Sequence, residues 1–476
     1  MRVPGRDPTP FTHLAAPACE SLAALTRCGR IIGRRYRMDT GLGHFGDRRL
    51  AQVGAFVLDR LVTVGQSGIR IRPLGGDRAG EIRITRFLRN PRVTPSEMIA
   101  TASARTAGLV KGRHVLLPQD TTGLRDDGDQ NSLQLHAMIA VDALDGALLG
   151  LVHGEFLRRR GGKKAQRKSR PFAEKESRRW LDAVRAAEPL VAAGAACVTA
   201  VGDAEKDIYE VFACRPPTVE LLVRACQDRV LADGTRLFTC TDGLAELGRV
   251  QIELPAAPGR LKRTAELALR TREVTIPRPR RRVPGEAAKL PPHVVLRLVE
   301  AREVNAPEGV EPAHWRLLTT HQVATLADAR QITGFYRERW TIEQLFRVKK
   351  TKGFNIEAVR IADVEPFENL AAATLIAAVQ VLQLVRDRDG TAGRPLEDVF
   401  DPSDQAALEA VCATLEGKTD RQKNPHAKGS LAYATWVCAR LGGWTGYYGK
   451  PGPIVVLNGF LRFKAMLHGW RLGRVV

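Results

Sequence analysis

Apolar residues recur with a helical period in the part of the chain that follows Gly46. Leu50, Val53, Val57 and Leu61 would lie on one face of a helix. The glycine-containing segment 74–80 predicts a loop, and Thr94 with Pro95 predicts the start of another helix, because Thr caps a helix and Pro is tolerated in its first turn. We therefore expect a helical region over residues 42–109.

Between residues 114 and 224 the pattern changes to short apolar runs, which are typical of strands. Asp145-Gly146 is a strong hairpin signal between two of these runs. The predicted elements are strands 114–120, 133–141 and 147–156, a basic loop 158–170, a helix 172–193, a strand 197–203, a helix 206–213 and a strand 219–224.

This order of elements is typical of a ribonuclease H-like core, so the predicted fold class is α/β. Residues 227–314 are polar, rich in proline and strand-leaning, and predict a β-rich insertion. Helical periodicity returns at 326–350 and 370–385. The predicted ribonuclease H-like domain is therefore 110–226 with 315–386. The region 387–476 is predicted to be helical and begins within a charged linker, 386–394.

The segment 336–350 contains neither Gly nor Pro and predicts one continuous helix. At about 100° per residue, Tyr336, Arg339 and Lys350 fall within about 40° of Glu343. A carboxylate therefore shares a stripe with two cations and a phenol. Such a stripe is most often a solvated ion-pair face. It would have a functional role only if further carboxylates of the chain lay close to Glu343 in the folded protein.

Two aspartates are candidates for carboxylates that lie close to Glu343. Asp120 and Asp203 each end an apolar strand, and ligands gather at the carboxyl ends of strands in α/β sheets. With Glu343 they offer three hard oxygen donors, which suit Mg²⁺ or Mn²⁺. The ordinary alternative for each aspartate is a cap of the following turn or helix.

Other chemistries find little support in the sequence. Asp126, Asp127 and Asp129 lie in a glycine-containing loop and are interpreted as turn residues. The His and Cys residues show no zinc-site spacing, and Cys214 and Cys226 lack partners of the right type. We find no phosphate-binding glycine loop and no nucleophile elbow, which argues against nucleotide hydrolysis and acyl transfer.

Composition favours an anionic partner. The chain has 476 residues, 44% of them apolar, which allows two to four domains. It carries 73 Lys and Arg against 52 Asp and Glu, a formal net charge of +21, and so basic a protein is usually a nucleic-acid binder. The alternative explanation of the high charge is an arginine-rich composition caused by a GC-biased genome.

Eight scattered cysteines indicate reduced thiols in a cytosol. The sequence shows no run of 18 apolar residues and no secretory signal.

The residues then resemble a known family. Tyr336, Arg339, Glu343 and Lys350 match the Y-(2)-R-(3)-E-(6)-K signature of DDE cut-and-paste transposases of the insertion-sequence-four family. The similarity is to the branch that includes the composite-transposon transposase of enteric bacteria. It extends from about residue 42 to the end through further segments that occur in the family's order: Gly46-Asp-Arg-Arg, Phe87-Leu-Arg-Asn-Pro, Asp120-Thr-Thr, Glu174-Lys-Glu-Ser, Gly202-Asp203, Asp207-Ile-Tyr, Trp315-Arg-Leu-Leu-Thr and Leu457-Asn-Gly-Phe-Leu.

The resemblance implies that Asp120, Asp203 and Glu343 are the catalytic, metal-binding triad for two Mg²⁺ ions, with Mn²⁺ as a substitute. It implies that a second set of side chains contacts DNA: Tyr336, Arg339, Lys350, Arg224, Trp315 and Trp340. The two tryptophans would hold a base flipped from the DNA end, although Trp315 could instead be a core residue. Arg224 fits only with a shift of one residue.

The implied function is a DNA transposase that binds terminal inverted repeats, cleaves them by hydrolysis and hairpin formation, and joins the 3′ ends to target DNA. It would act as a homodimer on double-stranded DNA in a prokaryotic cytoplasm, near the nucleoid and without a membrane. The alternatives are a non-catalytic end-binding relic and a metal-dependent nuclease without strand transfer.

Two departures from the family pattern stand out. Ala204-Glu-Lys follows Asp203 where Arg-Glu-Ala is expected, and the 158–170 loop is unusually basic. Residues 1–41 have no counterpart in the family, and Met38 makes a misplaced translation start a hypothesis for residues 1–37.

Overall fold

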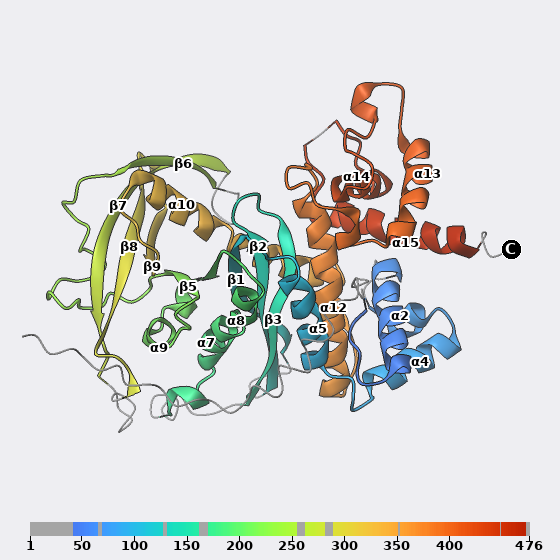
Figure 1. Ribbon diagram of the computed structural model, residues 1–476, viewed down its shortest axis with the longest axis horizontal. Coiled ribbons are helices and arrows are strands. Elements are labelled where there is room, and N and C mark those ends of the chain that lie inside the picture. Colours follow the sequence, from blue (N-terminus) through green and yellow to red (C-terminus); the bar gives the residue numbers. More distant parts are fainter. Residues whose placement is uncertain are drawn as a thin grey trace, which may run out of the picture. The chain divides into compact units, whose positions relative to one another are not determined.

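A nine-stranded mixed sheet is the largest element of the fold, with the strand order β3-β2-β1-β4-β5-β9-β8-β7-β6 (Figure 1). The structure is a computed structural model. It describes residues 41–64, 69–126, 131–160, 170–254, 262–280, 289–350, 353–447 and 449–472. The predicted N-terminal extension and the translation-start hypothesis lie outside these residues, apart from residue 41. Contacts group Thr40–Val476 as one unit.

The first five strands have the connections expected of the predicted core. β1 pairs with β2 and β2 with β3 in antiparallel fashion, whereas β1–β4 and β4–β5 are parallel. The bounds are β1 His114–Asp126, β2 Asn131–Asp142, β3 Leu148–Arg160, β4 Cys197–Gly202 and β5 Glu220–Arg224. This mixed α/β arrangement is consistent with a ribonuclease H-like domain. The hairpin after β2 turns at Gly146, whose φ of 72° suits glycine.

The predicted insertion extends the same sheet. β6 Gly248–Leu254, β7 Arg263–Pro277 and β8 His293–Val304 form an antiparallel run. β9 His314–Thr319 joins this run to β5, because it pairs with β8 on one side and with β5 on the other. The strand-leaning character of 227–314 is therefore confirmed, while its limits as a separate domain stay a prediction.

Helices cover both faces of the core strands (Figure 1). Val115 and Leu117 of β1 pack in one buried cluster with α7 Arg178–Arg185, α8 Glu188–Ala192 and α9 Tyr209–Ala213. Leu116, which points to the opposite face because side chains alternate along a strand, belongs to a second cluster. That cluster includes α5 Pro95–Ala107, α10 Leu326–Arg337, α11 Trp340–Lys349 and α12 Val364–Arg386.

The remaining helices lie before and after the core strands in the sequence. They are α2 Arg48–Val64, α3 Ile71–Gly75, α4 Arg78–Leu88, α13 Gln405–Leu415, α14 Leu431–Leu441 and α15 Pro453–Leu472. α5 begins as predicted, since the Thr94 hydroxyl accepts a hydrogen bond from the Glu97 N–H. α15, with 20 residues, is the longest of these six helices. The helices contribute to the same large core cluster as the sheet, so they are not confirmed as separate flanking domains.

Three local predictions are wrong for physical reasons. The expected loop 74–80 contains the end of α3 and the start of α4, where Gly80 lies so close to Gly75 that a Cβ on it would stand 2.1 Å from the Gly75 carbonyl oxygen. The expected helix 172–193 is interrupted between α7 and α8, where Pro189 cannot donate the helical hydrogen bond. The helix expected from residue 206 starts only at Tyr209, because Lys206 belongs to the 3₁₀ turn Ala204–Lys206.

Within the described residues, α12 is the one helix that is long and apolar enough to cross a membrane. Its apolar window is 94% buried inside the protein. Its partners include the Leu88 and Val93 carbonyls, which accept hydrogen bonds from the Asn369 amide. α12 is therefore a core helix.

Candidate active site

Asp120 and Asp203 lie level with each other just beyond the last paired residues of the parallel ladder β1–β4. The prediction that Asp120 ends a strand is wrong, because β1 continues to Asp126 through its pairing with β2. Pro118 pairs with Val201 in the ladder, and each aspartate stands two residues further along its own strand direction. Asp203 directly follows β4 and caps the 3₁₀ turn after it, accepting a hydrogen bond of 2.9 Å from the Glu205 N–H. The capping role therefore occupies one carboxylate oxygen of Asp203 and is compatible with a ligand role for the other.

Asp120 has an unusual electrostatic environment. Its side chain is 18% exposed, and burial raises its pKa to about 6, with the negative charges of Asp203 and Glu343 adding to the rise. The Thr121 N–H, 2.7 Å from Oδ1, and the Arg339 guanidinium act in the opposite direction. The three predicted carboxylates thus lie near enough to influence one another.

Arg339 joins two of these carboxylates. Its NH2 group donates to Glu343 Oε1 at 2.8 Å, and its NH1 group lies 3.4 Å from Asp120 Oδ2. The Arg339 side chain is 10% exposed and also lies over the Trp340 ring, 5.0 Å from its centroid. A buried positive charge therefore balances Asp120 and Glu343.

The predicted continuous helix 336–350 is wrong. α10 ends at Arg337 and α11 begins at Trp340, and the intervening N–H groups of Glu338 and Arg339 bond three residues back rather than four. No Gly or Pro causes this tightening. It coincides with the burial of Tyr336 and with the contact of Arg339 to Asp120, which are tertiary interactions.

Lys350 does not lie on the predicted helical stripe. α11 ends at Lys349, and Lys350 has an extended backbone with φ −92° and ψ −150°. Its Nζ pairs with Glu357 at 2.8 Å. The structure therefore brings Tyr336, Arg339 and Glu343 together but directs Lys350 elsewhere.

A cleft of about 840 Å³ meets the carboxylate group at Arg339, which lines the cleft and contacts Asp120 and Glu343. Five of the six predicted DNA-contacting residues line it: Arg224, Trp315, Tyr336, Arg339 and Trp340. Trp315 and Tyr336 meet edge to face with ring centroids 5.5 Å apart, whereas Trp340 is 42% exposed. Burial raises the pKa of Tyr336, whose hydroxyl also interacts with Arg224. Trp315 is both partly buried against the core and a wall of the cleft.

Two buried cations near the aspartates were missed by sequence reasoning. Arg179, on α7, donates to Thr121 Oγ1 and to Glu205 Oε2, both at 2.9 Å. It therefore links the residue after Asp120 to the turn after Asp203. Its neighbour Trp180 is 1% exposed, and a tryptophan in an arginine-rich helix was the available signal for a buried face.

The second missed cation is Lys206, which is fully buried and donates to the Ala200 carbonyl at 3.0 Å. Its alkyl chain packs on Gly202, where an added Cβ would stand 2.3 Å from Lys206 Cδ. Burial lowers the pKa of Lys206 well below its usual value, against the pull of Asp203. The departure from the family pattern after Asp203 thus places a lysine beneath the site.

The basic loop 158–170 lies mostly outside the described residues. Arg158 belongs to β3 rather than to a loop, and its guanidinium donates two hydrogen bonds of 2.9 Å to Glu368 of α12. Arg158 is therefore a structural ion-pair partner. Of the carboxylates interpreted as turn residues, Asp126 ends β1, and Asp127 and Asp129 lie outside the described residues.

The donor chemistry of the site fits a divalent cation. Three carboxylates supply hard oxygen ligands, and the Arg339 guanidinium already stands between two of them as a positive charge. Their oxygens do not all lie within 4.8 Å of one another, since the described group that meets this limit consists of other residues. If the carboxylates moved together to bind an ion, Arg339 would have to weaken its contact with Asp120 or Glu343.

Comparison with known families gives an independent result. Residues 159–380 match the family model of the transposase DDE domain. The match includes Asp203 and Glu343, begins after Asp120, and covers somewhat under half of the chain. It supports a DDE transposase and a role in DNA transposition and recombination. Such a family implies DNA substrates, a DNA-cleaving and joining activity, and use of divalent metal ions.

Proposed function

We propose that this chain is a transposase of the insertion-sequence-four type, which binds the terminal inverted repeats of its element, cleaves them through hydrolysis and hairpin formation, and joins the 3′ ends to target DNA. One observation carries the proposal. Arg339 contacts Asp120 and Glu343, and Asp203 lies near enough to Asp120 to raise its pKa. Arg339 also lines a cleft that carries four of the other predicted DNA-contacting side chains. A site for phosphoryl transfer and a surface for a DNA end therefore adjoin.

Asp120, Asp203 and Glu343 would hold Mg²⁺, two ions per site, with Mn²⁺ able to replace it. When bound, such ions activate an attacking hydroxyl and stabilise a leaving 3′-oxygen. The raised pKa of Asp120 means that a cation and a proton compete for this carboxylate. Arg179 would act as a positioning residue, because it fixes the backbone segments that follow both aspartates.

Arg339 has two roles in this proposal. In the DNA-free chain it neutralises part of the charge of Asp120 and Glu343. With DNA bound, its fork of N–H donors would grip a phosphate bidentately. Arg224 and Tyr336, which line the same cleft, would contact neighbouring phosphates. Lys350 would join them only after giving up its ion pair with Glu357.

The aromatic side chains of the cleft suit a strained DNA end. A hairpin unstacks the terminal base, and stacking on an indole compensates for part of that cost. The exposed ring of Trp340 is available for such stacking, while Trp315 is held by Tyr336 and the core. We assign to Trp340 the role of stacking on the unstacked base, and to Trp315 the role of a fixed side chain in the wall of the cleft.

The wider organisation follows the same proposal. Residues 42–109 would hold DNA, 110–226 with 315–386 would carry the chemistry, 227–314 would be an insertion in that domain, and 387–476 would pair two copies in a synaptic homodimer. The protein would act on DNA in the cytoplasm of a prokaryote, close to the nucleoid. Because many phosphates are contacted, binding should weaken steeply with salt.

The test uses the purified full chain with Mg²⁺ and DNA that carries the inverted repeats flanking its gene. Hairpin ends followed by integration support the proposal. Cleavage without joining indicates a nuclease, and a mobility shift without cleavage indicates an end-binding relic; either result contradicts the proposal. Glu343→Gln should abolish cleavage and keep end binding. Glu365→Gln, whose side chain is 71% exposed at the start of α12, is the matched control.

A further inference from the structure

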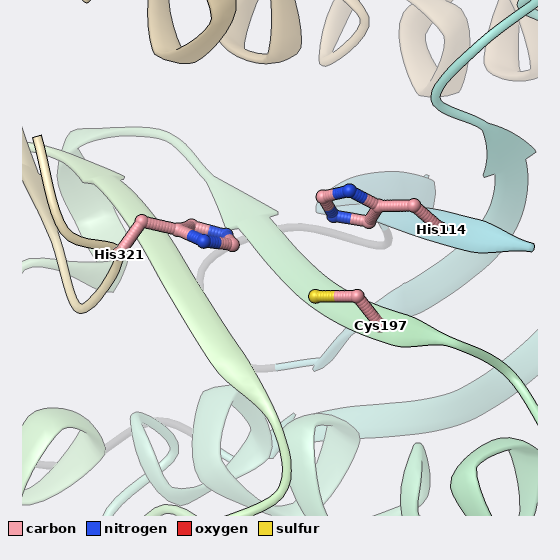
Figure 2. Close-up of side chains that lie close together, drawn as sticks. All are labelled: His114, Cys197 and His321. Atoms are coloured by element: carbon pink, nitrogen blue, oxygen red, sulfur yellow. The ribbon is translucent and has the colours of Figure 1, made fainter. Parts of the chain in front are cut away.

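Three side chains with metal-ligating atoms converge at the starts of β1 and β4 (Figure 2). His114 is the first residue of β1 and Cys197 the first of β4, and the two are register partners in the parallel ladder. His321 approaches from the segment between β9 and α10. One ligand atom from each residue lies within 4.8 Å of the other two. Sequence spacing did not reveal this cluster, because its three residues come from distant parts of the chain.

The cluster is a constructed site and not a chance surface encounter. The Thr199 hydroxyl, itself buried, contacts His114 Nε2 at 2.9 Å and His321 Nε2 at 2.8 Å. The His114 ring packs edge to face on Phe335, with centroids 4.8 Å apart. Both imidazoles are thus held in fixed orientations, with the Cys197 sulfur directed between them (Figure 2).

The donor set selects the kind of ion. Two imidazole nitrogens and one thiolate are preferred by Zn²⁺ and similar transition metals, whereas Mg²⁺ prefers oxygen. Tetrahedral Zn²⁺ places such donor atoms about 3.3 to 3.8 Å apart, so small side-chain rotations from the observed separation would suffice. Glu220, the first residue of β5, places negative charge near all three side chains and favours a cation there.

The protonation of the histidines is compatible with ligation. Burial lowers the pKa of His114 to about 4, and burial also lowers the pKa of His321. Both imidazoles are therefore neutral at neutral pH, which is the form that binds metals. Without a metal, the Thr199 hydroxyl is hydrogen-bonded to one nitrogen of each imidazole. The alternative explanation for the closeness of the two histidines is therefore this shared hydrogen bonding to Thr199.

We propose that His114, Cys197 and His321 form a binding site for a Zn²⁺-type transition-metal ion, separate from the carboxylate site. Three protein ligands leave a fourth position for water or another donor. The ion would join the starts of β1 and β4 to the segment that leads into α10, and α10 leads directly to Arg339 and Glu343. The site would therefore brace α10, the helix that precedes the one carrying Glu343.

The test is Co²⁺ binding to the full chain in the presence of excess Mg²⁺, which occupies oxygen sites. Wild type should give a thiolate-to-cobalt charge-transfer band at one equivalent, and Zn²⁺ should remove it. Cys197→Ser should lose the band, and His321→Ala should bind Co²⁺ at least about tenfold more weakly. Cys214→Ser, a second partly buried cysteine outside the cluster, should keep both the band and the affinity.

A thermal measurement gives a second readout that does not depend on DNA or on cleavage. Zn²⁺ should raise the unfolding temperature of wild type and of Cys214→Ser, because binding to the native state stabilises it. The same addition should leave Cys197→Ser unchanged. Absence of the cobalt band in wild type would overturn the proposal, as would an equal Zn²⁺ effect in Cys197→Ser.

Discussion

The two ends of the strand pair β1–β4 carry opposite coordination chemistry. At the starts of the strands, His114 and Cys197 offer nitrogen and sulfur. At the other end, Asp120 and Asp203 offer oxygen. In both cases a third residue arrives from the segment after β9: His321 at the first end, and Glu343 of α11 at the second. One parallel ladder can thus bring together two unrelated sites, because register aligns residues at both ends.

The difference between the ends lies in how each balances charge. The carboxylate end already contains a guanidinium, since Arg339 contacts both Asp120 and Glu343. The His and Cys end relies on a hydroxyl, that of Thr199, and on neutral rings. An ion at the carboxylate end would therefore compete with the Arg339 charge, whereas an ion at the other end would displace hydrogen bonds and the proton of the Cys197 thiol.

The substitution with the largest expected effect alters the carboxylate end of the ladder and should leave the His and Cys end unchanged. Asp120→Asn should lower the single-turnover rate of DNA-end cleavage by at least about a thousandfold, equivalent to about 4 kcal/mol of activation free energy, because a metal-holding carboxylate is lost. The same variant should keep the cobalt–thiolate band. Asp420→Asn, on an exposed turn, is the control. Loss of the band in Asp120→Asn would mean that the ends are coupled.

Arg179→Gln should give the next largest effect. It removes the hydrogen bonds to Thr121 and Glu205, and the free energy of unfolding should fall by about 1 to 3 kcal/mol. A higher Mg²⁺ concentration should also be needed for half-maximal cleavage, which a purely structural role would not require. Arg185→Gln on the same helix, with a side chain 53% exposed, is the control. An unchanged Mg²⁺ requirement would show that Arg179 does not position the aspartates.

Trp340→Ala tests the cleft that shares Arg339 with the carboxylate end. Base stacking on an aromatic ring is worth about 1 to 3 kcal/mol, so hairpin formation should fall about tenfold to a hundredfold. A DNA end that lacks its terminal base should restore much of the rate. Tyr447→Ala, another exposed aromatic at 50% exposure, should have no such effect. Failure of the altered DNA end to rescue would argue against stacking by Trp340.

The smallest effect is the pH dependence of stability in metal-free protein. The pKa of Asp120 is raised to about 6, so the native state holds an extra proton and stability falls as pH rises from about 4 to about 6. The pKa of His114 is lowered to about 4, so stability rises with pH between about 4 and 6.5. Each slope is at most about 1.4 kcal/mol per pH unit.

Two variants should separate these slopes in urea unfolding at pH 4.5 and pH 6, with a chelator present. Asp120→Asn should make stability rise more steeply with pH, and His114→Gln should make it rise less steeply or fall. Shifts of the same sign in both variants would contradict the assigned protonation states.

Sequence patterns were sufficient for much of the core. Alternating apolar runs located β1, β2 and β3, the Asp145-Gly146 turn located their hairpin, and Thr94 located the start of α5. These features depend on neighbours along the chain. The helix break before Pro189 was missed although its cause, a proline without an N–H, is local to the sequence. The break at Glu338–Arg339 was missed because it coincides with tertiary contacts of Tyr336 and Arg339. Lys350 was misplaced for the same reason.

The sequence by itself determined the basic character of the chain, the position of Asp203 directly after a strand, and the local spacing of Arg339 to Glu343. Those properties are set by residue type and by helical or strand periodicity. Only the tertiary structure decided that Arg339 lies between Asp120 and Glu343, that Arg179 and Lys206 are buried beside the aspartates, and that His114, Cys197 and His321 converge. Residues so distant in the chain meet through sheet register and core packing, which local periodicity does not specify.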